Sequence, residues 1–277
     1  MIAARLPGDR LHLQHGPIDL VIGADGARER AFIAATARFS TVLDELVAEL
    51  PLLRRDHGPQ PRGGIARAMW QAVQPFECFV TPMAAVAGAV ADAVLAAMVP
   101  ICGLQRAYVN NGGDIALHLT QGESFRLARA GLDRRDLGRI AISADDPVRG
   151  IATSGRGGRS LTMGIADQVT VLAPTAAMAD AAATLIANAV DLPGHPAIRR
   201  APANTLRDDS DLGTRPVVTH VGPLTPAETR TALTRGAAFA ESLRASGLIT
   251  AAALVLANTQ QIVGHIDTIP RKEPAHA

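Results

Sequence analysis

The segment AYVNNGGDIALHL at residues 107–119 decides how this sequence folds, because two apolar arms meet in an unusually polar turn. The arms, residues 107–109 and 115–119, have the composition of strands. A tight hairpin needs only two residues, such as Asn-Gly, between its strands. Here the turn holds two asparagines, two glycines and an aspartate: Asn110, Asn111, Gly112, Gly113 and Asp114. The segment therefore predicts a hairpin whose turn also has a second role.

The composition of the chain limits the kinds of protein it can be. Of its 277 residues, 48% are hydrophobic and 19% charged, which is typical of a globular protein with a sizeable core. Lysine and arginine number 27 against 26 acidic residues, so no basic surface for nucleic acid is indicated. Aromatic residues make up only 3%, which disfavours base-stacking platforms. We expect no nucleic-acid partner.

The two cysteines, Cys78 and Cys102, form no CxxC pair and no zinc-binding pattern. We expect them to be reduced, buried thiols, as in a cytoplasmic protein. None of the eight histidines belongs to an HxxxH or HxH pair, so no transition-metal site is predicted.

No membrane partner is expected either. The N-terminal segment has Pro7, Asp9 and Arg10 where a signal peptide would carry its apolar run. The longest apolar stretch, residues 83–99, is interrupted by Gly88. It falls short of the roughly 18 uninterrupted apolar residues of a membrane span. These features predict a cytoplasmic protein, and they leave a homo-oligomer open.

Hydrophobic periodicity predicts both helices and strands. Pro51 is expected to end the first helix. Helices are predicted at residues 27–50, 65–73, 82–98, 176–190 and 226–244. Outside the opening hairpin, strands are predicted at residues 18–22, 125–128, 139–143, 151–153, 168–173, 217–220, 251–257 and 260–263. Residues 191–214 are rich in Pro, Asp and Arg and predict a long surface excursion. Because strands often follow one another directly, the pattern favours an α+β fold, with antiparallel sheets and helices on their outer faces, over a parallel sheet.

Two further segments contain residues that could carry chemistry. In residues 151–171, IATSGRGGRSLTMGIADQVTV, a glycine-rich loop leaves an apolar strand, and its backbone N–H groups could hold a phosphate. The loop lacks both the P-loop and the GxGxxG pattern, and a solvated turn explains it equally well. Asp180 and Thr184 lie one turn apart on one helix face, where a carboxylate and a hydroxyl suit magnesium. Favourable placement of Asp180 near the helix start explains that pair without a metal.

Taken together, these motifs resemble the ApbE-like superfamily in order and spacing. The shared motifs are NGGD (111–114), ATSG (152–155), ADQVTVLAP (166–174) and ADAAAT (179–184). The superfamily includes magnesium-dependent FAD:protein FMN transferases. The sequence is most similar to an uncharacterised bacterial and archaeal family with the ApbE-like fold, which also shares TPMAAVAGAVADAVL (81–95). The resemblance runs over about residues 18–263. It implies one ApbE-like domain over residues 1–277, with a flexible tail at 264–277.

The resemblance also implies a site. The turn would lie at a flavin, FAD or FMN, through Asn111, Gly112, Gly113 and Asp114. The glycine-rich loop would contribute Thr153, Ser154, Gly155, Arg159 and Ser160. Asp180 and Thr184 would bind Mg²⁺, together with the backbone carbonyl of Ala87. These segments are far apart in sequence, so the resemblance predicts that they converge on one cleft.

The sequence departs from the transferases at two places. Their AKG lysine motif is replaced by Ala87-Gly88-Ala89, and their HIIDPRTG-like stretch by RSLTMGIAD at 159–167. Arg159 stands where the nearer family tends to have histidine. Three functions stay open: a magnesium-dependent FMN transferase, a protein that binds a flavin, pterin or other phosphorylated metabolite without transfer, and another reaction of cofactor metabolism. No catalytic residue is assigned. The sequence has no GxSxG elbow, which disfavours a hydrolase.

Overall fold

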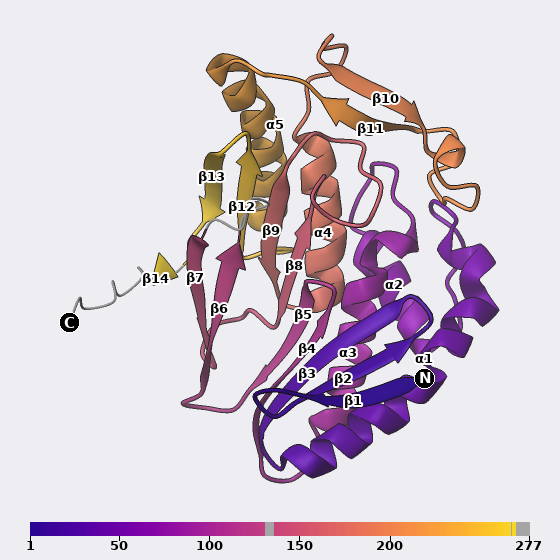
Figure 1. Ribbon diagram of the computed structural model, residues 1–277, viewed down its shortest axis with the longest axis vertical. Coiled ribbons are helices and arrows are strands. Elements are labelled where there is room, and N and C mark those ends of the chain that lie inside the picture. The colour runs from indigo at the N-terminus through magenta and orange to yellow at the C-terminus, as the bar shows by residue number, and fades with distance from the viewer. Residues whose placement is uncertain (131–135, 267, 270–277) are drawn as a thin grey trace.

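A nine-stranded antiparallel sheet forms the centre of the computed structural model of the protein (Figure 1). The structure describes residues 1–130, 136–266 and 268–269. Every neighbouring pair of strands in the sheet is antiparallel. The strands, in spatial order, are β1 (Ile2–Leu6), β2 (Arg10–His15), β3 (Ile18–Gly26), β4 (Leu104–Asn111), β5 (Asp114–Leu119), β8 (Gly150–Ser154), β9 (Gln168–Ala173), β12 (Ala251–Leu256) and β13 (Thr259–Gly264).

The helices cover one face of this sheet, and lie behind it in Figure 1. Their alanine-rich faces and a few large side chains, such as Phe39 and Met98, build the main core against the sheet. The α-helices are α1 (Arg28–Leu53), α2 (Gly64–Val73), α3 (Val86–Met98), α4 (Ala176–Ala189) and α5 (Pro226–Ala245), and the short 3₁₀ turns are η1 (Pro82–Ala85) and η2 (Ala203–Thr205). None of the helices within the described residues is long and apolar enough to cross a membrane.

A second, smaller sheet covers part of the opposite face. It consists of β6 (Ser124–Ala130), β7 (Asp136–Ser143) and β14 (Thr268–Ile269). Ile140 and Ile142 of β7 pack against Leu117 of β5 in a separate apolar cluster. A two-stranded sheet, β10 (Ile198–Pro202) with β11 (Pro216–Val221), extends beyond α4. The predicted α+β class with antiparallel sheets is confirmed, but the helices lie on one face and the second sheet on the other.

Several predicted boundaries were wrong. Helix α1 passes through Pro51 and ends at Leu53. Pro51 lacks the N–H that would bond to the carbonyl four residues earlier. The helical pattern nevertheless continues, because the Arg54 N–H bonds to the Leu50 carbonyl (3.1 Å) and Leu53 is fully buried. The predicted helix at 82–98 is divided into η1 and α3. Cys78 and Cys102 are exposed rather than buried. Of the expected tail, residues 267 and 270–277 lie outside the described residues.

Helices α3 and α4 are joined by two crossed hydrogen-bond links. The carboxylate of Asp92, on α3, accepts the backbone N–H groups of Ala176 (3.1 Å) and Ala177 (2.9 Å) at the start of α4. The carboxylate of Asp180, on α4, accepts the N–H of Gly88 (3.0 Å) at the start of α3. A Cβ atom at Gly88 would lie 2.1 Å from the Ala176 carbonyl oxygen, so only glycine permits this approach. The start of each helix is therefore capped by a residue of the other.

Candidate functional site

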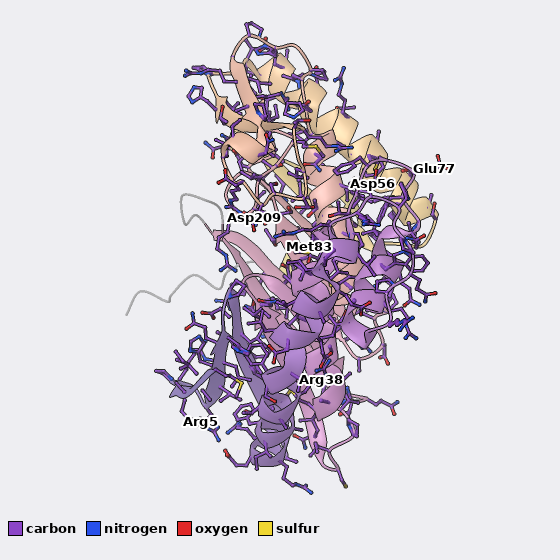
Figure 2. The ribbon with its side chains drawn as sticks, turned by 90° about the vertical axis from the view of Figure 1, so that its right-hand side faces the viewer. Arg5, Arg38, Asp56, Glu77, Met83 and Asp209 are labelled. Carbon is purple, nitrogen blue, oxygen red and sulfur yellow. The ribbon has the colours of Figure 1, made fainter. Side chains whose placement is uncertain are left out.

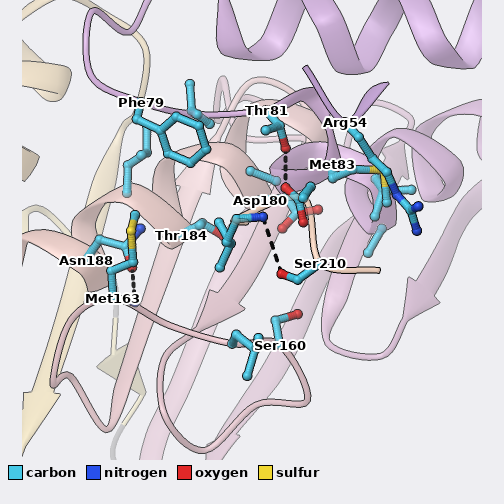
Figure 3. A pocket seen from close by; sticks show the side chains of 18 of the residues that line it. Arg54, Phe79, Thr81, Met83, Ser160, Met163, Asp180, Thr184, Asn188 and Ser210 are labelled. Carbon is cyan, nitrogen blue, oxygen red and sulfur yellow. Dashed lines mark hydrogen bonds between the residues drawn. The ribbon is translucent and has the colours of Figure 1, made fainter. Parts of the chain in front are cut away.

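A cavity of about 320 Å³ lies between the η1–α3 junction, α4 and two loops (Figure 3). Asp180 and Thr184 face it from α4, and Ser160 faces it from the loop after β8. Ala87 and Asp114 also line it. The structure therefore brings Asp114 of the turn, Ser160 of the loop and the start of helix α4 to one cavity, as the sequence predicts.

The conformation and contacts of the turn between β4 and β5 account for its unusual sequence. Gly112 and Gly113 adopt φ angles of 67° and 118°, which favour glycine. The side-chain oxygen of Asn110 accepts the N–H of Gly113 (2.8 Å) and closes the turn. The buried Asn111 donates from Nδ2 to the carbonyl of Ala87 (3.1 Å), which ties the turn to the start of α3. Asp114 then begins β5 and faces the cavity.

The carboxyl of Asp114 is an unusual group for such a turn. It is partly buried, and its Oδ1 accepts the N–H of Thr153 at 3.3 Å. Burial raises the pKa of Asp114 to about 7, although the Thr153 hydrogen bond and the positive charge of Arg159 oppose the rise. At neutral pH this carboxyl is therefore held near its titration midpoint.

Asp180 is perturbed in the same direction. Burial raises the pKa of Asp180 well above its usual value, and the negative charge of Asp114 raises it further. The backbone N–H groups of Gly88 and Ala87 oppose the rise, while Asp92 adds to it. Two carboxyls that disfavour each other's charge thus share one cavity, which is the arrangement that a cation or a shared proton relieves.

The remaining predicted residues lie behind the cavity wall. The Ser154 hydroxyl makes a 3.4 Å contact with the Thr184 hydroxyl, and the Thr153 hydroxyl lies 3.1 Å from that of Thr170. Gly155, at φ 133°, packs against the Asp167 carbonyl, where a Cβ would lie at 2.7 Å. The close backbone packing at position 155 therefore requires glycine.

Arg159 lies over Gly112 of the turn. A Cβ atom at Gly112 would lie 2.3 Å from the Arg159 guanidinium. This contact places the positive charge beside the turn that carries Asp114, which agrees with its effect on the pKa of Asp114. Arg159 thus acts on the electrostatics of the cavity without being part of the wall.

One wall of the cavity was not predicted. Residues 206–212, within the surface excursion expected at 191–214, close over it and contribute Arg207 and Ser210. This segment is held by three contacts: Arg54 to Asp209 (2.9 Å), Thr81 to Asp211 (2.5 Å), and Arg207 to the Arg159 carbonyl (2.6 Å). Figure 2 shows Asp209 beside Met83, far from it in sequence. A loop without hydrophobic periodicity gives no signal of such docking.

The donors in the cavity suit a hard cation. Asp114, Asp180 and Thr184 offer only oxygen atoms, the ligands that magnesium prefers. Burial raises the pKa of both aspartates, and the charge of Asp114 raises that of Asp180 further, so a positive charge would be favoured between them. Within the described residues, no group of three or more His, Cys, Asp or Glu side chains is arranged to hold a metal. The Ala87 carbonyl, at the start of α3, accepts from the Nδ2 of Asn111 (3.1 Å).

Comparison with solved structures gives two broad similarities. The flavin transferase ApbE from Vibrio cholerae covers 95% of this chain and 97% of its own, with a TM-score of 0.42 and 15% identity. The apo flavinyl transferase ApbE of Pseudomonas stutzeri covers 95% and 92%, with a TM-score of 0.43 and 14% identity.

Sequence comparison gives nearer relatives and a family. The UPF0280 protein MK0206 of Methanopyrus kandleri is 35% identical over 143 residues, 52% of this chain and 54% of the relative. The UPF0280 protein of Methanothermobacter thermautotrophicus is 32% identical over 180 residues, 65% of this chain and 64% of the relative. The chain thus spans about half to two thirds of these relatives' length. The profile of the family described as "AbpE bacteria" matches residues 3–267. The chain therefore belongs to the family described as "AbpE bacteria".

Proposed function

We propose that the cavity binds a flavin nucleotide together with Mg²⁺. The observation that carries the proposal is the pair of partly buried carboxyls, Asp114 and Asp180, which line one cavity and both have a raised pKa. The resemblance of the sequence motifs to the ApbE-like superfamily, which includes FAD:protein FMN transferases, supports a flavin as the ligand class.

The residues of the cavity have separable roles in this proposal. Asp180, Thr184 and Asp114 would hold the ion, and Ala87 would add its carbonyl oxygen. When bound, Mg²⁺ neutralises phosphate charge and polarises the phosphoryl group. Arg207 lines the same cavity and adds a fixed positive charge for a phosphate. The segment 206–212 shields the ligand from solvent.

The size of the cavity favours a mononucleotide. Ligand sites range from about 300 to 1,000 Å³, and this cavity of about 320 Å³ lies at the lower end. An FMN, or the FMN half of FAD, is therefore the part that we expect to bind. The absence from the sequence of the transferases' lysine and of their HIIDPRTG-like stretch favours binding over flavinyl transfer.

Calorimetric titration tests the proposal directly. FMN affinity is expected to rise about 5- to 150-fold when Mg²⁺ is present, the usual range for coupled ligands, and FMN should raise the affinity for Mg²⁺ by the same factor. Asp180→Asn removes the charge but keeps a side-chain oxygen for the Gly88 N–H, so the variant should fold and lose this gain. If the unmodified protein binds FMN with the same affinity in the presence and absence of magnesium, the proposal is contradicted.

A matched control separates charge at the site from charge in general. Asp145 is exposed and lies outside the cavity, so Asp145→Asn should leave the magnesium-linked gain unchanged. FAD in place of FMN tests for transfer in the same samples. Cleavage of its pyrophosphate, with the FMN moiety passing to a hydroxyl acceptor, would release AMP, and detection of AMP would extend the proposal from binding to phosphoryl transfer.

A further inference from the structure

A second cavity lies on the opposite face of the nine-stranded sheet, between it and the sheet of β6 and β7. This inter-sheet cavity has a volume of about 620 Å³, well within the range of ligand sites. Gly113 and Thr153 line it, whereas their neighbour Asp114 lines the first cavity. The two cavities are thus separated by the β4–β5 turn and the end of β8, and the second is not explained by the proposed function.

The walls of the inter-sheet cavity are apolar and partly aromatic. Ile115 and Leu117 of β5 face Leu127 and Ile140 of the smaller sheet. Tyr108 and Phe125, one from each sheet, meet edge to face at 5.9 Å and 84°. Tyr108 is fixed against the backbone, because a Cβ atom at Gly23 would lie 2.3 Å from its ring. A slot between two sheets, with aromatic rings at its edge, suits a flat aromatic molecule.

Polar groups at the deep end would orient such a molecule. Gln168 and Thr170 are 9% and 2% exposed and line this cavity. The Gln168 amide donates to the Thr170 hydroxyl at 3.4 Å, its one hydrogen bond to a side chain within the described residues. A carboxamide offers two donors and an acceptor, so a second donor and the carbonyl oxygen are left for a ligand.

The rim carries positive charge that the protein does not neutralise. Arg106 pairs with Asp25 and Glu123, and Arg28 pairs with Asp9 and Asp25. Arg10 and Arg126 are exposed, line the inter-sheet cavity, and form no salt bridge within the part of the chain that the structure describes. Arg10 donates from Nε to the Pro7 carbonyl (2.9 Å), which leaves its terminal nitrogens for an anion. Burial raises the pKa of the Tyr108 hydroxyl, and the neighbouring Arg10 opposes the rise. Two guanidinium groups that have no carboxylate partner among the described residues lie beside an aromatic slot, and they are suited to a carboxylate, sulfonate or phosphate.

We infer that the inter-sheet cavity is a second ligand site, for a planar aromatic compound that carries an anionic group. The ring system lies between the sheets beside Tyr108 and Phe125. The anion lies at the rim, between Arg10 and Arg126. Gln168 bonds the polar edge of the ring from the deep end.

Two fluorescent probes that differ by one charge test this site. Anilinonaphthalene sulfonate has the ring system and the anion, and N-phenylnaphthylamine has the ring system alone. In the Arg10→Gln/Arg126→Gln double variant, affinity for the sulfonate is expected to fall at least about tenfold, the effect of lost charge-assisted hydrogen bonds, with the neutral probe within about twofold. Arg230→Gln, an exposed arginine on α5, is the control and should change neither. A double variant that binds the sulfonate as tightly as the unmodified protein would overturn the inference.

Two further measurements locate the probes and separate this site from the first. Leu127→Trp should fill the cavity and lower the affinity for both probes. If both affinities are unchanged, the probes bind elsewhere and the proposed site is refuted. Because Tyr108 is the only tyrosine, its ionisation can be followed by ultraviolet difference spectroscopy. Bound sulfonate should raise the Tyr108 pKa further, and no change in that pKa would count against the site. Asp180→Asn should leave sulfonate affinity intact without magnesium, so failure of the proposed function would not affect this result.

Discussion

Replacing Asp114 by asparagine is expected to increase the free energy of unfolding by about 2–4 kcal/mol at about pH 8, while removing the magnesium-linked gain in ligand affinity. The pKa of Asp114 is about 7 in the folded protein against 3.8 for the ordinary side chain. Each unit of difference corresponds to about 1.4 kcal/mol, and the partial exposure of the carboxyl to the cavity lowers the full figure. Asparagine keeps an oxygen for the Thr153 N–H and carries no charge.

The pH dependence follows from the direction of this shift. Because the folded state holds its proton more tightly than the unfolded state, stability is greatest below the unfolded pKa of 3.8 and declines as pH rises to about 7. The pKa of Asp180 is also raised, so Asp180 likewise makes stability decline as the pH rises. Urea unfolding across this range should show a shallower decline for Asp114→Asn than for the unmodified protein. Asp145→Asn, at an exposed site, should reproduce the unmodified slope. An Asp114→Asn variant that is less stable at pH 8 would show that the carboxylate is structural.

The Gly88→Ala variant is expected to lose about 3 kcal/mol or more of stability. Helix propensity alone predicts the opposite, a gain of about 1 kcal/mol. The new methyl group would lie 2.1 Å from the Ala176 carbonyl oxygen, so α3 and α4 must separate. Overpacking costs about 1–3 kcal/mol, and disturbing the Gly88–Asp180 hydrogen bond adds about 1–3 kcal/mol.

Gly64 provides a matched control for that variant. It is the first residue of α2, and a Cβ atom there meets nothing within 4 Å. Gly64→Ala should therefore stabilise the protein by about 0.4–1 kcal/mol, mainly by restricting the unfolded chain. Chemical denaturation of both variants measures the contrast. Equal effects of the two substitutions would mean that the α3–α4 contact yields to the added methyl group.

Much of the fold could be predicted because its elements repeat locally. The strand at Gln168–Ala173 and the helix at Ala176–Ala189 have strong apolar patterns and lie within one residue of prediction. Strand β1 was missed because its residues are mostly exposed, which leaves no alternating pattern. Pro51 was misjudged because the rule for proline takes no account of the burial that follows it.

The site was predictable only in part, and for a different reason. Spacing alone left Asp180 and Thr184 explicable without a metal, and only the resemblance to a family joined them to the turn at Asp114. The docking of residues 206–212 depends on single polar contacts, such as Thr81 with Asp211, across long separations. No local pattern encodes a contact of that kind. Within the described residues Arg10 and Arg126 have no carboxylate partner, and this too emerges only when the neighbouring arginines are seen to be paired.

The crossed caps between α3 and α4 affect how relatives of this protein should be compared. Asp180 accepts a backbone hydrogen bond that the start of α3 needs whether or not a ligand is ever bound. A descendant that had lost the ligand would still be selected to retain Asp180 and Gly88 together. Thr184 makes only a long contact with the Ser154 hydroxyl within the described residues, so its retention owes little to the scaffold. In related sequences that no longer bind the ligand, we therefore expect Thr184 to be lost before Asp180. A sequence that retains Asp180 but lacks Thr184 would indicate that the site no longer functions.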